Sequence, residues 1–188
     1  IRIDVDNSKQ PNSRWYSGSG IYRDVNLWTG KDVYISHDKL RITTLSVNDD
    51  MAVIEVCAQL KNIIGHGLEA ECLIEIKKDG QKTASDTQRV VFRSEQMQTV
   101  RVQIPIEHPK KWSPKQPALY ECHITTKFDD KICDEAVSNF GIRVLALDPV
   151  RGLQINGETF KLRGTCIHHD NGVIGAETFK EAEWYRCK

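Results

Sequence analysis

Alternation of apolar and polar residues dominates the middle of the chain. Between residues 31 and 146, seven segments repeat apolar side chains with a period of two, the spacing that places side chains on one face of a β-strand. These segments are residues 32–39, 40–47, 51–60, 68–78, 98–106, 118–128 and 131–145. Turn-forming residues separate them, and Lys78-Asp79-Gly80 is typical of a hairpin because Asp and Gly tolerate positive φ. Seven short strands with no helical pattern between them predict an all-β fold, an antiparallel β-sandwich of the immunoglobulin type.

One proline-rich segment interrupts the alternation. Residues 108–120, HPKKWSPKQPALY, place three prolines around Trp112. Proline has no backbone N–H to donate to a strand ladder, so we predict an ordered crossover with Trp112 as its apolar anchor. A rigid loop that closes one end of the sandwich is the preferred interpretation over a ligand-binding aromatic.

The segments on either side of the sandwich follow other patterns. Residues 1–8 predict a strand, and residues 10–29 gather glycines and aromatic residues around a basic centre. Residues 152–164 predict a β-hairpin with Asn156-Gly157 at its turn, and residues 176–188 have a helical composition. Both ends of the sequence fall inside an element, so we expect the sequence to be part of a longer polypeptide.

Charge and composition exclude several classes of function. Of the 188 residues, 26 are Lys or Arg and 26 are Asp or Glu, so the chain lacks the basic excess that nucleic-acid binding requires. No apolar run approaches the roughly 20 residues that a membrane-spanning helix needs. We therefore predict no nucleic-acid partner and no membrane partner.

The six cysteines do not form a metal or redox motif of the Cys-x-x-Cys kind. Strand parity places Cys57 on the face opposite the apolar positions of its segment, whereas Cys72 lies on the apolar face of its own. A disulfide between them would require Cβ atoms that converge, so we expect free thiols. This cysteine usage leaves the cellular compartment open.

Potential chemistry is densest in residues 162–172, LRGTCIHHDNG. Cys166, His168, His169 and Asp170 could be a metal site, part of an active site or a polar turn. A zinc site would need a loop that re-aims neighbouring side chains, which point to opposite faces of a strand, and would also need a fourth ligand. We therefore predict no metal and no cofactor in this chain.

Three segments resemble the β-galactosidase and β-glucuronidase group of glycoside hydrolases, family 2. The first is RWYSGSGIYRDVNL, residues 14–27, and the third is GLQINGETFKLRGTCIHHDNGVIGA, residues 152–176. The second joins residues 112–126 to residues 140–148, with Trp112, Pro117, Leu119, Tyr120, Phe140, Gly141 and Arg143 at the family's positions. The three segments occur in the family's order, and their sequences are most similar to those of β-galactosidases of the Bacteroides type.

The resemblance implies an architecture of three parts. Residues 1–29 would be the tail of a sugar-binding jelly-roll domain, residues 30–147 the immunoglobulin-like sandwich, and residues 148–188 the first strand and helix start of a catalytic (β/α)8 barrel. The sandwich would then act as a scaffold between domains of a retaining β-glycosidase.

The resemblance also implies that the catalytic residues lie elsewhere. Retaining glycosidases use two carboxyl groups, and in this family both are glutamates on later barrel strands, the acid/base Glu directly following an Asn. No Asn-Glu dipeptide occurs in this sequence. We therefore expect both catalytic glutamates beyond Lys188 and no hydrolysis by this chain alone.

Three residues are the candidates for contact with substrate. His168 matches the family's histidine that contacts sugar hydroxyls after the first barrel strand, residues 160–167, and an imidazole can donate or accept there according to its tautomer. Arg14 and Trp15 match the jelly-roll loop that reaches the sugar pocket, where Arg can bond hydroxyls and Trp can stack on a sugar face. Packing between domains is the alternative for Trp15.

Two other interpretations remain beside the hydrolase. One is a stand-alone immunoglobulin-like binding or adhesion module, and the other is a small metalloprotein centred on Cys166, His168 and Asp170. For the hydrolase, the expected partners are a β-galactoside-type carbohydrate and the rest of its own jelly-roll and barrel domains. Apolar residues near the ends, among them Ile21 and Trp184, predict self-association of the chain in isolation.

Overall fold

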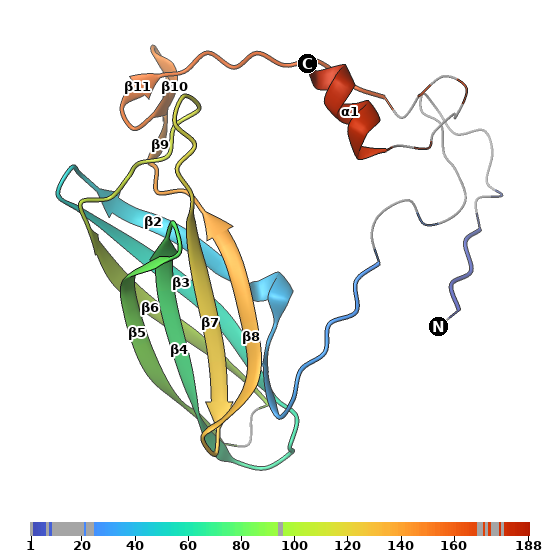
Figure 1. Ribbon diagram of the computed structural model, residues 1–188, viewed down its shortest axis with the longest axis vertical. Helices are drawn as coiled ribbons and strands as arrows, with labels where there is room; N and C mark the ends of the chain where they lie inside the picture. Colours follow the sequence, from blue (N-terminus) through green and yellow to red (C-terminus); the bar gives the residue numbers. More distant parts are fainter. Residues whose placement is uncertain are drawn as a thin grey trace. The chain divides into compact units, whose positions relative to one another are not determined.

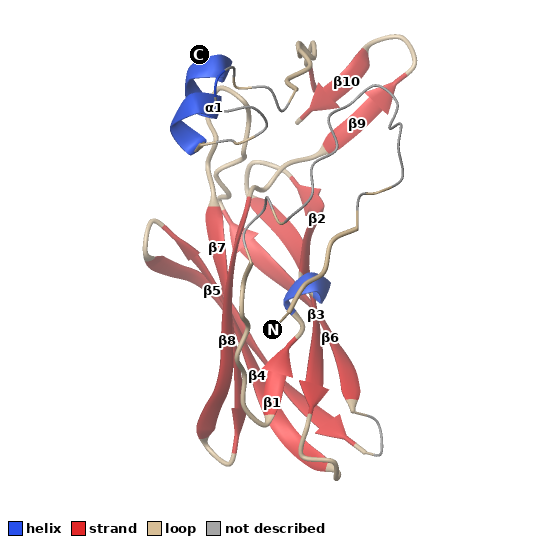
Figure 2. Cartoon of the chain, turned by 90° about the vertical axis from the view of Figure 1, so that its right-hand side faces the viewer, coloured by secondary structure: helices blue, strands red, loops and turns tan. Residues whose placement is uncertain are grey.

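In the computed structural model the chain divides into two units, Thr29–Leu162 and a second unit of Ile1–Trp28 with Arg163–Lys188. The structure describes residues 2–6, 8, 21, 25–93, 96–168, 171, 173, 177 and 179–188. The first unit holds the predicted sandwich, whose two sheets face each other in Figures 1 and 2.

The first sheet is built around the long strand β3, Met51–Asn62. Strand β6, Met97–Glu107, pairs antiparallel with one edge of β3 from Met51↔Glu107 to Lys61↔Met97. The other edge of β3 pairs first with β2, Arg41–Val47, and then with the short β1, Val33–Ile35. A single 3-10 turn, His37–Lys39, joins β1 to β2.

The second sheet contains four antiparallel strands in the order β5-β4-β7-β8. Their bounds are Leu68–Lys78 for β4, Gln81–Phe92 for β5, Tyr120–Phe128 for β7 and Lys131–Phe140 for β8. Together with the order β2-β3-β6 in the first sheet, this is the strand arrangement of an immunoglobulin-like sandwich. The predicted all-β sandwich is confirmed.

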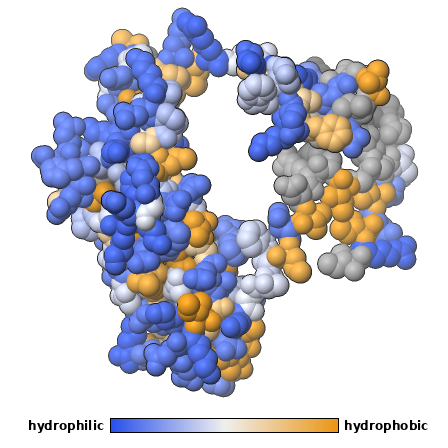
Figure 3. Space-filling model, viewed as in Figure 1, coloured by the Kyte–Doolittle hydropathy of each residue, from blue (hydrophilic) through white to orange (hydrophobic). Residues whose placement is uncertain are grey.

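Alternation along the strands produces the core as the sequence predicts. In β3 the buried apolar residues are Ala52, Ile54, Val56, Ala58 and Leu60, which face inward at every second position. Cys72 is buried and Cys57 is only partly buried, as the strand parity predicts, and all six cysteines are free thiols. Hydrophilic residues cover much of the sandwich face that is visible in Figure 3.

Strand β5 is the element of the sandwich that the sequence pattern did not predict. Only the end of β5 buries apolar side chains, those of Val90 and Phe92. Most of its residues are polar and at least partly exposed. It lies at the edge of its sheet, where polar side chains are tolerated and also discourage pairing with another chain. Its register with β4, from Leu68↔Phe92 to Lys78↔Gln81, is fixed by the predicted Asp79-Gly80 turn.

Polar side chains fasten the short strand β1 to the second sheet. The hydroxyl of Thr126, which is fully buried, donates to the carbonyl oxygen of Val33 at 2.8 Å. The Asp134 carboxylate accepts the backbone N–H of Ile35, also at 2.8 Å. These side chains bond to backbone groups on the edge of β1 that pairs with no strand in the described part of the chain, so they connect the two sheets.

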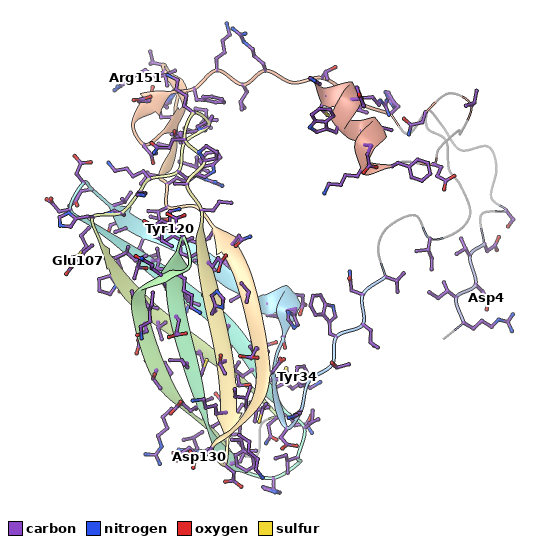
Figure 4. The ribbon with its side chains drawn as sticks, viewed as in Figure 1. Asp4, Tyr34, Glu107, Tyr120, Asp130 and Arg151 are labelled. Atoms are coloured by element: carbon purple, nitrogen blue, oxygen red, sulfur yellow. The ribbon has the colours of Figure 1, made fainter. Side chains whose placement is uncertain are left out.

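The proline-rich crossover ends at Tyr120, which the sequence indicates only through its resemblance to the family pattern. The phenolic oxygen of Tyr120, at the start of β7, accepts the backbone N–H of Lys110 at 2.8 Å. This bond to upstream backbone corresponds to the tyrosine corner of immunoglobulin-like domains, and the Tyr-x-Cys spacing to Cys122 fits the same strand. Figure 4 marks Tyr120 and, at the opposite end of the sandwich, Asp130 in the β7–β8 turn.

A small three-stranded sheet follows the sandwich within the same unit. It consists of β9, Leu145–Asp148, β10, Gly152–Ile155, and β11, Glu158–Thr159, in the order β11-β10-β9. We call residues 145–159 the hairpin segment. Asn156 and Gly157 have φ values of 52° and 82°, which confirms the predicted hairpin turn at this dipeptide.

The second unit contains the helix α1, Lys180–Cys187, where the composition predicts one. The strands predicted over residues 1–8 and 160–167 are not confirmed, because residues 2–6 and 160–167 form no strand ladder. A strand is defined by backbone bonds to a neighbouring strand, and no such neighbour for 160–167 occurs among the described residues. No helix in the described part of the chain is long and apolar enough to cross a membrane.

Candidate functional site

Of the three predicted substrate-contacting residues, the structure describes His168. Arg14 and Trp15 lie outside the described residues, and so do His169 and Asp170. His168 is exposed and follows the extended segment that leads out of the hairpin segment. The described contact of His168 is between its backbone and the helix α1 that comes after it.

An arginine on α1 holds the backbone at His168. The Nη2 atom of Arg186 donates to the His168 carbonyl oxygen at 2.9 Å. Its Nη1 atom donates to Asn171 Oδ1 and to Glu183 Oε1, both at 3.1 Å. Glu183 lies one turn earlier on α1, so the carboxylate and the helix together orient the guanidinium toward His168.

Asn171 extends this network to the residue Glu177. Its side-chain Nδ2 donates to the Glu177 carbonyl oxygen at 2.7 Å, while its Oδ1 accepts from Arg186. The guanidinium thus donates to separate groups from both of its terminal nitrogens, which the planar fork of Arg allows and Lys would not reproduce. Arg186 is not among the residues predicted from the sequence, although its i, i+3 spacing from Glu183 on a predicted helix was an available signal.

The contact between Arg186 and His168 is made through the main chain of His168. The bond from Arg186 uses the backbone carbonyl and not an imidazole nitrogen. A neutral imidazole donates from one ring nitrogen and accepts at the other.

The described residues contain no group of three or more His, Cys, Asp or Glu side chains that could hold a metal ion. Cys166 is exposed and is not part of any such group. His169 and Asp170, the other members of the hypothetical zinc site, lie outside the described residues, so that alternative stays a hypothesis.

The sandwich carries shallow surface grooves of its own. One, of about 560 Å³, is lined by charged residues of β4, β5 and the β7–β8 turn. Four of its charged residues form pairs across the strands: Arg89 with Glu69, and Lys127 with Glu71 at 3.7 Å. The bond to Glu69 raises the pKa of Arg89 further above its usual value, and the carboxylates leave no cationic excess for an anionic ligand.

A second groove of about 520 Å³ lies between β2 and the end of β8. Its lining mixes apolar and polar residues, namely Ile42, Thr43, Thr44, Leu119, Asn139, Phe140, Gly141, Arg143 and Leu145. Neither groove includes His168.

Comparison with known proteins finds a matching family and several relatives. Residues 33–143 match the family model described as glycosyl hydrolases family 2. The β-galactosidase BoGH2A of Bacteroides ovatus is 30% identical over 94% of this chain, and a putative β-glucuronidase of Formosa agariphila is 29% identical over 93%.

Solved structures show the same relationship. A glycosyl hydrolase family 2 member from Bacteroides cellulosilyticus superposes with a TM-score of 0.85 at 31% identity, covering 97% of this chain and 25% of that one. A β-glycosidase from Bacteroides vulgatus superposes with a TM-score of 0.80 at 28% identity, covering 97% and 23%. The chain spans 21% of the length of the Bacteroides ovatus relative and 16% of the Formosa relative.

Proposed function

Because the chain belongs to family 2 of the glycosyl hydrolases, we propose that it is a non-catalytic part of a retaining β-glycosidase of the β-galactosidase type. The observation that carries the proposal is the family match over the sandwich, residues 33–143, together with the curated β-galactosidase that aligns with almost the whole chain. The substrate would be a carbohydrate with a β-galactoside linkage.

The chemistry of a retaining glycosidase would be supplied outside this sequence. Retention needs two carboxyl groups about 5–5.5 Å apart, one as nucleophile and one as acid/base. The sequence contains no Asn-Glu dipeptide, which is the expected context of the acid/base residue. Both catalytic glutamates would therefore lie beyond Lys188, and the 188 residues alone would not hydrolyse a glycoside.

The sandwich would act as the scaffold between the domains that bind and cleave the sugar. Residues 1–29 would complete a jelly roll, residues 30–147 form the sandwich, and residues 148–188 begin the barrel. Support for a rigid scaffold comes from the continuous core and from the bonds of Thr126 and Asp134 that connect the two sheets. The partners would be these other domains of the same polypeptide.

Within this proposal His168 would contact sugar hydroxyls, with Arg186 holding its carbonyl oxygen in place. Arg14 and Trp15 would contribute from the jelly-roll side, by bidentate hydrogen bonds and by stacking on a sugar face. No metal or other cofactor would be needed for these contacts.

The test compares two proteins with a chromogenic β-galactoside. The 188-residue chain is expected to show no turnover, whereas the longer polypeptide that includes this sequence is expected to hydrolyse the substrate and release the β-anomer first. In the longer protein His168→Ala is expected to raise KM by about tenfold, the effect of losing one or two polar contacts. Turnover by the 188 residues, or release of the α-anomer by the longer protein, would contradict the proposal.

A further inference from the structure

Asn156 makes more contacts than its place in a hairpin turn requires. Its backbone adopts the positive φ of the turn, for which Asn, Asp and Gly are all suitable. Its side-chain Nδ2 donates to the carbonyl oxygen of Trp112 at 2.9 Å, and its Oδ1 accepts the backbone N–H of Val144 at 3.0 Å. The backbone N–H of Asn156 also donates to the Val144 carbonyl oxygen at 2.9 Å. One turn residue thus bonds to two segments outside its own hairpin.

Trp112 is itself fixed to the end of the second sheet. Its backbone N–H donates to the Ile142 carbonyl oxygen at 2.8 Å. The guanidinium of Arg143 lies over the indole ring, 4.6 Å from its centre, which is a favourable cation–π distance. Gly141 permits this packing, because a Cβ atom at that position would come within 2.8 Å of the Trp112 side chain.

These contacts connect three parts of one unit: the crossover at Trp112, the segment that follows β8, and the hairpin segment. The amide side chain uses both its donor and its acceptor here, so replacing it removes the partners of the Trp112 carbonyl oxygen, in a part-buried bond, and of the exposed Val144 N–H. The ladder of β10 and β11 does not depend on either bond, since its pairs Gln154↔Thr159 and Ile155↔Glu158 involve other residues.

We infer that Asn156 is a latch, a residue whose side chain fixes the hairpin segment to the sandwich through Trp112, so that the two move as one rigid body. The latch sets the direction in which the chain leaves the hairpin at Phe160. The inference concerns residues 112–159 only and does not depend on the proposed function. Its test uses the 188-residue chain without substrate, so the two proposals can fail separately.

The experiment measures residual dipolar couplings of backbone amides in weakly aligned solution. In the unmodified chain, one alignment tensor is expected to fit the strands β1–β8 and the hairpin segment together. Asn156→Gly keeps the positive φ of the turn and removes both side-chain bonds, so the hairpin segment is expected to require a separate and weaker tensor. The exchange protection of the Val144 amide is expected to fall by about tenfold.

Asn156→Asp separates the two bonds, because a carboxylate still accepts from Val144 but cannot donate to Trp112. Its hairpin segment is expected to require a separate tensor, as in Asn156→Gly, while the exchange protection of the Val144 amide is retained. Gly141→Ala displaces the indole and is expected to release the hairpin segment in the same way, whereas Gly164→Ala, which meets no atom within 4 Å, is the matched control.

Three results would overturn the inference. A single tensor that still fits Asn156→Gly would mean that other contacts hold the hairpin segment. An Asn156→Asp chain that behaves like the unmodified one would mean that Trp112 is not the attachment point. Loss of the cross-strand contacts between Gln154 and Thr159 in Asn156→Gly would mean that Asn156 only forms the turn.

Discussion

Two side chains of the second sheet, Thr126 and Asp134, hold the short strand β1 of the first sheet. β1 has only three residues, and a strand of this length contributes few ladder bonds of its own. The hydroxyl of Thr126 and the carboxylate of Asp134 bond to backbone groups of Val33 and Ile35. Buried backbone groups must be paired, so these two side chains act in place of a neighbouring strand.

Thr126→Val tests this role with almost no change in side-chain shape. The substitution removes the donor to the Val33 carbonyl oxygen in a fully buried position, so the free energy of unfolding is expected to fall by about 1–3 kcal/mol. Thr87→Val, on an exposed position of β5, is the control and is expected to change the free energy by less than about 0.5 kcal/mol. Urea denaturation measures both, and equal effects of the two substitutions would contradict the role of the hydroxyl.

At the scale of the structural elements, the tight turns between strands share one backbone feature. Three of them place two consecutive residues at positive φ: Asp79-Gly80, Asp129-Asp130 and Asn156-Gly157. Such turns match the right-handed twist of the strands that they join. Gly80 meets no atom within 4 Å at the place of a Cβ, so at this position the backbone torsion alone demands glycine.

Gly80→Ala is therefore expected to lower the free energy of unfolding by about 1 kcal/mol, through torsional strain without a steric clash. Gly80→Asn is the matched variant at the same position. It is expected to cost about half as much or less, because the Asn side chain tolerates the left-handed region. Thermal or urea unfolding compares the two, and an Asn variant as unstable as the Ala variant would exclude the torsional explanation.

Elements with regular alternation could be predicted from the sequence, and edge elements could not. Strand β3 buries every second residue and was predicted almost to its ends. Strand β5 was missed because its position at the sheet edge allows a polar sequence, so its pairing depends on β4 and on the turn between them. The strand expected over residues 160–167 has a suitable pattern but no neighbour among the described residues.

The candidate site was predictable only as a set of residue types. The family pattern indicates His168, yet nothing in the pattern shows that Arg186, 18 residues later, bonds to its carbonyl oxygen. That contact depends on where α1 begins and on the path of the chain between them. Arg14 and Trp15 remain predictions, because they lie outside the described residues.

At the scale of the whole molecule, the sandwich core contains two thiols that resist ionisation. Cys72 of β4 and Cys122 of β7 are fully buried, and burial raises the pKa of each thiol to about 12 from its usual 9.0. The negative charge of Glu71 acts on Cys72 in the same direction, and an ionised Cys72 would have this effect on Cys122. The low-dielectric core disfavours the thiolate, so both groups stay protonated while the sandwich is folded.

Alkaline conditions should therefore destabilise the sandwich. Between pH 9 and about 12 the unfolded chain releases these two protons and the folded chain keeps them, so the free energy of unfolding falls as pH rises. The slope is about 1.4 kcal/mol per pH unit for each thiol, and the effect is absent below pH 9. Urea denaturation at several pH values measures it.

Cys72→Ala and Cys122→Ala provide the comparison, because other groups also titrate in this range. Each variant is expected to be less stable at neutral pH through the loss of buried volume, but to show a shallower decline between pH 9 and 12. The same slope in the variants and in the unmodified chain would show that the two thiols do not cause the alkaline loss.

Because these two sulfurs are buried, their rate of chemical modification can measure how often the sandwich opens. An alkylating reagent would modify the exposed Cys166 and Cys187 at once, whereas Cys72 and Cys122 would react only during moments when the sheets separate. The time course of their modification, followed by mass spectrometry in native buffer, would give the frequency of those moments without any denaturant. The two native cysteines can therefore serve as probes of transient opening, with no label added to the protein.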